Sequence, residues 1–174
     1  MNFMDILLKR RSVRTYSQEP IEEEVLKQIL QAGLAAPSGR AKRPWEFVVI
    51  KDRDMLERMA ECRTAGAAML KEAAAAIVVL GDESATDVWT EDCSIALTQM
   101  HLMASVLGVG SCWIQGRLRE TKNGLTTEED LRTLLHFPEQ MRLEAILSLG
   151  MPKEETKPHT REELMEEKIH WDRY

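Results

Sequence analysis

The chain has 174 residues, about the length of one domain, and its hydrophobic (44%) and charged (30%) fractions are those of an ordinary globular protein. Its formal net charge of -6 argues against nucleic acid as the main partner, because binding a phosphate backbone requires a broad basic face. The three cysteines and four histidines lack the spacing of metal ligands, so we expect reduced thiols and no metal site.

The first third of the chain predicts two helices and a strand. Residues 2–10 are expected to form a short helix with basic residues at its C-terminal end. Residues 21–35 carry apolar side chains at three- and four-residue spacing, which is typical of an amphipathic helix. A Pro-Ser-Gly sequence ends this helix, and the β-branched and aromatic residues over 45–50 predict a strand.

The middle of the chain predicts a helix, a buried strand and a second, very apolar helix. Residues 54–75 are expected to be helical with an interruption near Gly66, and the apolar run over 76–80 is typical of a strand buried on both faces. Residues 91–107 predict a helix that is apolar nearly all round. Such a helix must be covered on every side, so we expect it to form a subunit interface.

The last third predicts a strand, a helix, a strand and a tail. A glycine turn leads into a strand that ends at Ile114, and Thr126 with Glu129 has the spacing of a capping box at a helix start. Residues 143–149 predict the last strand, and the charged tail over 152–174 still carries apolar residues that need a packing partner. Four strands separated by helices predict one α/β-type domain, with a sheet covered by helices on both faces.

We expect neither a membrane span nor an export signal in this chain. Its longest apolar stretch, residues 93–114, is broken by polar residues and glycines, so it predicts a core helix and strand. The opening residues lack the charged-then-apolar order of a signal peptide. We therefore expect a cytoplasmic protein without a membrane partner.

Two basic segments stand out in this acidic chain. The first basic segment, residues 10–14, places three guanidinium groups and a hydroxyl within five residues (Arg-Arg-Ser-Val-Arg). The second basic segment, residues 36–43, adds three cations beside a rigid turn (Ala-Pro-Ser-Gly-Arg-Ala-Lys-Arg). A local excess of positive charge predicts an anion site, and phosphate is the commonest anion that needs one. The cations are too few for nucleic acid and suit one small phosphorylated ligand.

Other nucleotide and catalytic motifs are weak or missing from the sequence. Gly108-x-Gly110 follows a helix and precedes a strand, which is the reverse of a dinucleotide-binding turn. The sequence contains no P-loop and no GxSxG, and its Ser, His and Asp residues do not group as a triad.

The two basic segments and three further stretches resemble the nitroreductase family of flavin enzymes. The likeness comprises RRSVR, then APSG with RPWEFVVI, then LGVGSCWIQG over residues 107–116, and finally LGMP and KIHW near the end. These motifs occur in the right order and span nearly the whole chain, so the sequence is identified as a member of this family.

The resemblance implies the fold and the partners. It implies an α+β three-layer sandwich, in which helices cover a central, mostly antiparallel or mixed sheet. Residues 1–174 would form a single FMN-binding domain in an obligate homodimer, with FMN in two clefts along the subunit interface. Residues 152–174 would form a tail that packs on the partner subunit.

The resemblance also implies a set of flavin-binding residues. Arg10 and Ser12 would hold the FMN phosphate or ribityl chain with help from Arg11, and Arg14 would lie near the N1/C2=O edge, where a cation stabilises the reduced flavin. The full cofactor-binding set comprises Arg10, Arg11, Ser12, Arg14, Pro37, Ser38, Gly39, Ile114, Gln115, Gly116, His159 and Arg161.

The remaining members of this set have separate implied roles. Residues 37–39 would reach the flavin from the partner subunit, and residues 114–116 would line the ring with a backbone N–H facing N5 or O4. His159 and Arg161 would form a second basic pair on the phosphate. The chain departs from the family where Ala41 and Arg43 replace the more usual Asn and Gln, and where His159 replaces Lys or Arg.

The resemblance implies an FMN-dependent oxidoreductase with a ping-pong mechanism. NAD(P)H would deliver hydride to flavin N5 and leave, and an electron-poor acceptor such as a nitroaromatic or quinone would then take the electrons. Because the flavin does the chemistry, no catalytic side chain is expected. The alternatives are reductive dehalogenation of halophenols, as in iodotyrosine deiodinase, and a flavin protein for sensing or storage without efficient turnover. A binding module without flavin is the last alternative.

Overall fold

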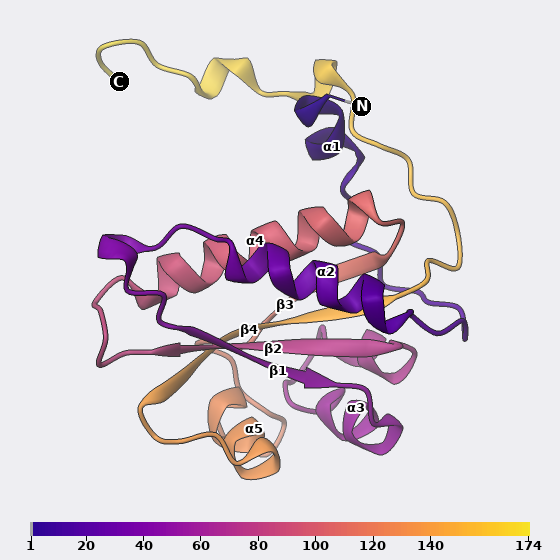
Figure 1. Ribbon diagram of the computed structural model, residues 1–174, viewed down its shortest axis with the longest axis vertical. Coiled ribbons are helices and arrows are strands. Elements are labelled where there is room, and N and C mark those ends of the chain that lie inside the picture. Colours follow the sequence, from indigo (N-terminus) through magenta and orange to yellow (C-terminus); the bar gives the residue numbers. More distant parts are fainter. Residues whose placement is uncertain (1) are drawn as a thin grey trace.

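The computed structural model describes residues 2–174, which form a sandwich around one four-stranded sheet (Figure 1). The strand order is β1-β2-β4-β3, and every pair of neighbouring strands is antiparallel. The strands are β1 (Trp45–Ile50), β2 (Ala75–Asp82), β3 (Gly110–Gln115) and β4 (Met141–Gly150). Among residues 2–174, the one parallel pairing with the sheet is an isolated bridge between Ser12 and Ser111, so the expected α+β sandwich with a mostly antiparallel sheet is confirmed.

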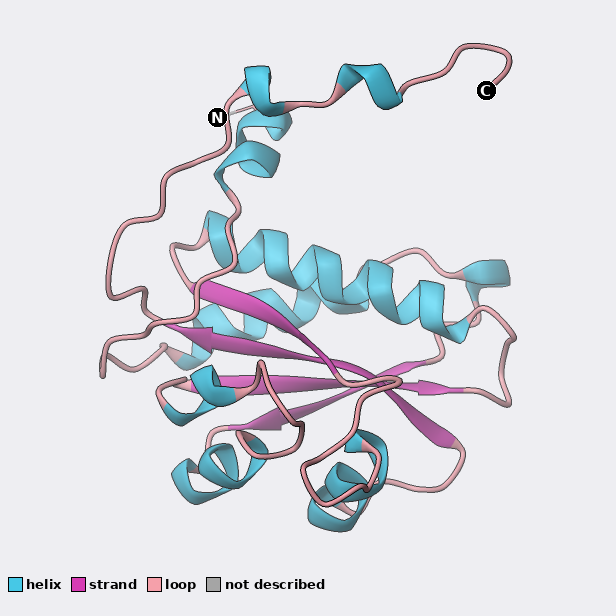
Figure 2. Ribbon diagram, turned by 180° about the vertical axis from the view of Figure 1, so that it is seen from behind, coloured by secondary structure: helices cyan, strands magenta, loops and turns pink. Residues whose placement is uncertain are grey.

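Helices cover both faces of the sheet, and a short helix and the tail lie outside the sandwich (Figures 1 and 2). One face carries α2 (Glu23–Leu34) and α4 (Trp89–Val106), and the other carries α3 (Arg53–Met59) and α5 (Thr127–Leu135). Helix α1 (Phe3–Lys9) lies beyond α4, next to the tail. Four 3-10 turns complete the order: η1 (Gly39–Ala41), η2 (Ala68–Lys71), η3 (Arg161–Glu163) and η4 (Glu166–Lys168).

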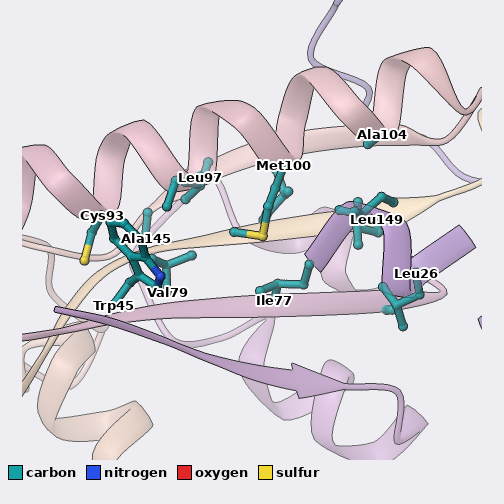
Figure 3. Close-up of a cluster of buried hydrophobic side chains, with 14 of the residues drawn as sticks. Leu26, Trp45, Ile77, Val79, Cys93, Leu97, Met100, Ala104, Ala145 and Leu149 are labelled. Carbon is teal, nitrogen blue, oxygen red and sulfur yellow. The ribbon is translucent and has the colours of Figure 1, made fainter. Parts of the chain in front are cut away.

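Strand β2 is central to both cores, as its continuous apolar sequence predicts. Ile77 and Val79 pack on the side of α2 and α4, together with Leu97 and Met100 of α4 (Figure 3). The alternate residues of β2 pack on the side of α3 and α5. On the α4 side, Gly33 lets α2 approach closely, because a Cβ there would lie 2.8 Å from the Met100 Cγ.

The helix expected over 54–75 is confirmed only in its first part, and its predicted extent is wrong. Helix α3 ends at Met59, and turns lead to η2 before β2 begins. In these turns the Thr64 N–H donates to the Glu120 carbonyl at 2.8 Å, and the Arg63 guanidinium donates to the Gln115 carbonyl at 2.9 Å. These bonds to distant parts of the chain replace the local helical bonds that the composition favours. The other predicted elements agree with the structure to within about two residues at each end.

Helix α4 keeps exposed apolar side chains although it lies on the sheet. Ile95 is 39% exposed and Val106 is 44% exposed, so a single chain leaves part of the helix uncovered. None of the helices in residues 2–174 is long and apolar enough to cross a membrane. Within the same residues, no three His, Cys, Asp or Glu side chains gather as a potential metal site.

Candidate functional site

The first basic segment leaves α1 and runs beside the edge strand β3. The Val13 N–H donates to the Ser111 carbonyl at 2.9 Å, and Ser12 forms its parallel bridge with Ser111. Two buried residues, Val13 and Tyr16, hold the segment, and the Tyr16 hydroxyl lies 2.8 Å from the Val13 carbonyl and 2.7 Å from Ser148 Oγ. The segment is therefore an ordered extension of the sheet.

Arg10 is held by a buried histidine of α4. Its Nη1 lies 3.0 Å from His101 Nε2, and His101 Nδ1 lies 2.6 Å from Ser111 Oγ. Burial, and secondly the charge of Arg10, lowers the pKa of His101 to about 4. The imidazole is thus neutral near pH 7 and accepts a hydrogen bond from the guanidinium.

The three arginines of the first basic segment form a cluster of cations that no carboxylate of residues 2–174 contacts directly, although Arg11 is close enough to Glu163 for its charge to act on that carboxylate. Within residues 2–174, none of Arg10, Arg11 and Arg14 forms an ion pair with a carboxylate. Burial, and then the charge of Arg11, lowers the pKa of Arg10. A desolvated cation beside a second cation is costly unless an anion joins it, so this donor set fits a phosphate.

The tail brings His159 and Arg161 to the neighbourhood of α1. The His159 N–H donates to the Leu8 carbonyl at 2.9 Å, and Arg11 donates to the Lys157 carbonyl at 2.7 Å. His159 Nδ1 lies 2.6 Å from a carboxylate oxygen of Glu163, and within residues 2–174 Arg161 forms no hydrogen bond with Arg10. An acid therefore accompanies the second basic pair, which the sequence reasoning did not anticipate.

The second basic segment is held by a different residue of α4. The Gly39 N–H donates to Asp92 Oδ1 at 2.8 Å, and the Arg43 N–H donates to Ser38 Oγ at 2.9 Å. Asp92 is buried, and its Oδ2 has no partner within the described residues. A side chain at position 39 would place its Cβ 2.8 Å from Val88 Cγ2, so the close approach to α4 requires glycine.

The same segment carries backbone strain. Arg40, Ala41 and Arg43 have φ angles of 53°, 55° and 49°. This left-handed region is unfavourable for residues with a Cβ, and Asn tolerates it better than Ala or Arg. The two departures from the family, Ala41 and Arg43, thus fall at positions where the backbone is strained.

The predicted ring-lining residues lie where β3 ends. Ile114 is buried in the core on the side of α3 and α5, so only its backbone is available to a ligand. Gln115 is fixed by its side chain, since its Oε1 accepts from Trp113 Nε1 at 2.9 Å. The N–H groups of Gly116 and Arg117 donate to the Glu144 carbonyl at 3.2 Å and 2.9 Å.

Glu144 supports this turn from a β-bulge in β4. Ala145 pairs with Val79 while Leu143 pairs with Leu80, which leaves Glu144 as the extra residue. Its side chain is 3% exposed and lies 3.2 Å from Ser94 Oγ, and burial raises its pKa. The backbone carbonyl of Glu144 thus holds the turn after Gln115, while its carboxyl group contacts Ser94 of α4.

Within a single chain, the two basic segments lie apart. His101 and Asp92, which hold them, lie about 13 Å apart along the axis of α4. A cavity of about 420 Å³ adjoins the first segment on the side of Arg11 and Val13, between the Gly108–Gly110 turn and the tail. No residue of the second segment lines this cavity, so the sequence-predicted set is not assembled within one chain.

His101, Asp92 and Glu144 were missed by the sequence reasoning. His101 served there only as a polar interruption of an apolar stretch. One feature of the sequence could have pointed to these three residues: each is a polar residue in an element that must be buried. A buried polar group requires a partner. That signal does not identify the partner.

Comparisons with known proteins agree with this architecture. The model of the nitroreductase family matches residues 7–62 and 60–151. A protein of Archaeoglobus fulgidus, named as a candidate NADH dehydrogenase/NAD(P)H nitroreductase, is 40% identical over 156 residues, which cover 87% of this chain and 86% of that protein. An FMN-dependent nitroreductase of Clostridium difficile R20291 has a TM-score of 0.96 at 39% identity, covering 99% of this chain and 100% of that one.

A further solved structure contains the expected cofactor. A candidate nitroreductase of Desulfovibrio desulfuricans, solved in complex with FMN, has a TM-score of 0.80 at 25% identity, covering 100% of this chain and 99% of that one. The family model and the relatives extend over most of the chain, and the motifs and the sandwich agree with them. The chain therefore belongs to the nitroreductase family.

Proposed function

We propose that the protein is an FMN-dependent oxidoreductase that passes electrons from NAD(P)H to electron-poor acceptors, such as nitroaromatics or quinones, by a ping-pong mechanism. The observation that carries the proposal is the arginine cluster of residues 10–14, which has no carboxylate partner within residues 2–174. The names of the similar proteins, FMN-dependent nitroreductase and NAD(P)H nitroreductase, support the cofactor and the donor.

The chain's own residues would bind and orient the cofactor. Arg10 and Ser12 would hold the phosphate or ribityl chain, with Arg11 assisting, because Ser12 bridges to Ser111 of β3 and His101 holds Arg10 beside the same residue. Arg14 is exposed and donates to the Ser12 carbonyl at 3.3 Å, so its charge remains available to the flavin edge. FMN supplies the hydride-accepting chemistry when bound.

The turn at Gln115–Gly116 would act as a rigid wall for the ring. Its backbone and side-chain bonds to Trp113 and Glu144 leave it little freedom. A wall of this kind would orient the ring without transferring a proton from a side chain. This agrees with a reaction that requires no catalytic side chain. His159 and Arg161 would add positive charge near the phosphate from the tail.

We further propose a homodimer with FMN at the subunit interface. An apolar groove of about 400 Å³ lies between α1, α2 and α4 and is lined by Phe3, Ala32, Leu102 and Val106, among others. Phe3 is 67% exposed, and Trp171 of the tail is 85% exposed. Groups of exposed apolar side chains favour coverage by a second copy, which would also bring the second basic segment to the partner's flavin.

The test is steady-state turnover by the purified protein, together with its flavin content. We expect bound FMN, and we expect NAD(P)H oxidation that depends on an added nitroaromatic or quinone, with parallel double-reciprocal lines. Turnover with a halogenated phenol alone would favour the dehalogenase instead. Bound FMN without turnover would favour a sensing or storage protein, and a colourless protein would exclude a flavin function.

A further inference from the structure

A single buried imidazole links the first basic segment to α4 and to β3. His101 is 7% exposed, and its two ring nitrogens contact Arg10 and Ser111. The two contacts lie on opposite sides of the ring, at 3.0 Å from Nε2 to Arg10 Nη1 and 2.6 Å from Nδ1 to Ser111 Oγ. The nitroreductase motifs do not include this position.

The chemistry of the neighbours fixes the tautomer of this histidine. A guanidinium only donates hydrogen bonds, so Nε2 must accept and its proton must be absent. The proton of the neutral ring therefore lies on Nδ1 and is donated to the Ser111 hydroxyl. The low pKa of His101, about 4, agrees with a ring that stays neutral.

The charges around the ring come from few elements. Arg10, from the first basic segment, is the charged group that contacts it, and Ser111 is its partner on β3. Arg11 and Cys112 act on Arg10, where the Arg11 charge lowers the pKa of Arg10 and Cys112 opposes this effect. Within residues 2–174, no carboxylate is bonded to the ring or to Arg10.

We propose that His101 is a positioning residue that orients Arg10 toward the phosphate of FMN and thereby favours FMN over riboflavin. The inference rests on the proposed function, in which Arg10 binds that phosphate. His101 takes one of the five guanidinium N–H groups, and this is the one hydrogen bond of Arg10's side chain within the described residues. The side chain is thus held in one orientation while four donors remain for the anion.

The test compares FMN with riboflavin, which lacks the phosphate, by fluorescence titration of the full chain. His101→Leu removes the acceptor at similar volume and should lower the FMN affinity about five- to tenfold, because a bond to a charged group is lost. The riboflavin affinity should change less than about twofold on the same principle. His101→Gln offers a replacement acceptor and should recover part of the FMN affinity.

A matched control separates positioning from folding. Leu56→Ala removes a buried side chain from the core on the α3 side of the sheet, away from Arg10 and the first basic segment. It should lower stability and leave the ratio of FMN to riboflavin affinity unchanged. If His101→Leu weakened both flavins equally, its role would be structural and the proposal would be wrong.

Two further measurements make failure of the proposal distinct from failure of the proposed function. In an Arg10→Ala background, His101→Leu should have no further effect on FMN affinity, and an undiminished effect would overturn the proposal. If Arg10→Ala itself left FMN affinity unchanged, the phosphate assignment would fail first. Nitrogen NMR of the imidazole should show the proton on Nδ1 at neutral pH, and a proton on Nε2 would contradict the proposed geometry.

Discussion

The two basic segments have similar compositions and are stabilised in opposite ways. The first is extended, paired with β3 and anchored by the buried Val13 and Tyr16. The second is a loop with three left-handed residues, and its main anchor is the Asp92 carboxylate. A neutral imidazole holds the cationic side chain of the first segment, whereas a carboxylate holds the backbone of the second.

The difference shows which segment is complete within one chain. Sheet pairing and buried side chains give the first segment a fixed shape before any ligand binds. The second segment stores strain that its own chain does not visibly compensate, which is expected of a loop whose ligand or partner lies elsewhere. This contrast supports the proposal that residues 37–39 reach the flavin of the other subunit.

The largest expected effect is the response of the first segment's anchor, His101, to acid. His101 has a folded-state pKa of about 4, against an ordinary value of 6.5. Between these values the unfolded chain binds a proton that the folded chain does not, so the free energy of unfolding falls as the pH falls from about 6.5 to 4, by up to about 3 kcal/mol. Urea unfolding at pH 7 and pH 4.5 should show this loss in the wild type and a smaller loss in His101→Gln. Equal losses in both proteins would mean that His101 does not carry the effect.

The next largest effect is expected from Arg10, the residue of the first segment that is proposed to bind the FMN phosphate. Arg10→Ala removes a charge-assisted contact of roughly 1.5–3 kcal/mol, so FMN affinity should fall about tenfold or more. Flavin fluorescence titration measures this change. Lys27→Ala on α2, whose ion pair with Glu23 is exposed, is the matched loss of one cation and should leave the affinity unchanged. An Arg10→Ala protein with normal FMN affinity would place the phosphate elsewhere.

Local sequence signals predicted most of the fold. Strand β1 was predicted with its observed bounds, and α5 begins at the expected capping box of Thr126 and Glu129. The prediction failed between α3 and β2, where Thr64 and Arg63 bond to residues far along the chain. The local sequence pattern indicates the periodicity of helices and strands. It does not show which distant carbonyl accepts the hydrogen bond that would otherwise be made within a helix.

The site was predictable only in part, for the same reason. The first basic segment stands out because its charge opposes that of the chain. The residues that anchor the two segments do not stand out in the sequence, because His101 lies 91 positions from Arg10 and Asp92 lies 53 positions from Gly39. Both anchors are buried polar residues of α4, and the pairing depends on how α4 sits against the sheet.

A steric change tests the fixed position of the second segment. Gly39→Ala places a methyl group 2.8 Å from Val88 Cγ2, so either α4 or the loop must shift, at a cost of about 1–3 kcal/mol in the free energy of unfolding. Val88→Ala removes the opposing methyl group, and the double variant should recover most of the loss in urea unfolding. A double variant no more stable than Gly39→Ala would show that the contact with Val88 is not the cause.

The smallest expected effect tests the strain itself. Ala41 has a φ of 55°, where glycine has no Cβ penalty, so Ala41→Gly should raise the free energy of unfolding by about 1 kcal/mol. The matched control is Ala32→Gly inside α2, which should lower it by about the same amount, because glycine is unfavourable in a helix. If urea unfolding showed changes of opposite sign in the free energy of unfolding of the two variants, it would establish that the second segment is strained where the first is relaxed. A loss of stability in both variants would mean that the left-handed conformation at residue 41 costs little, and the contrast between the segments would then rest on their anchors alone.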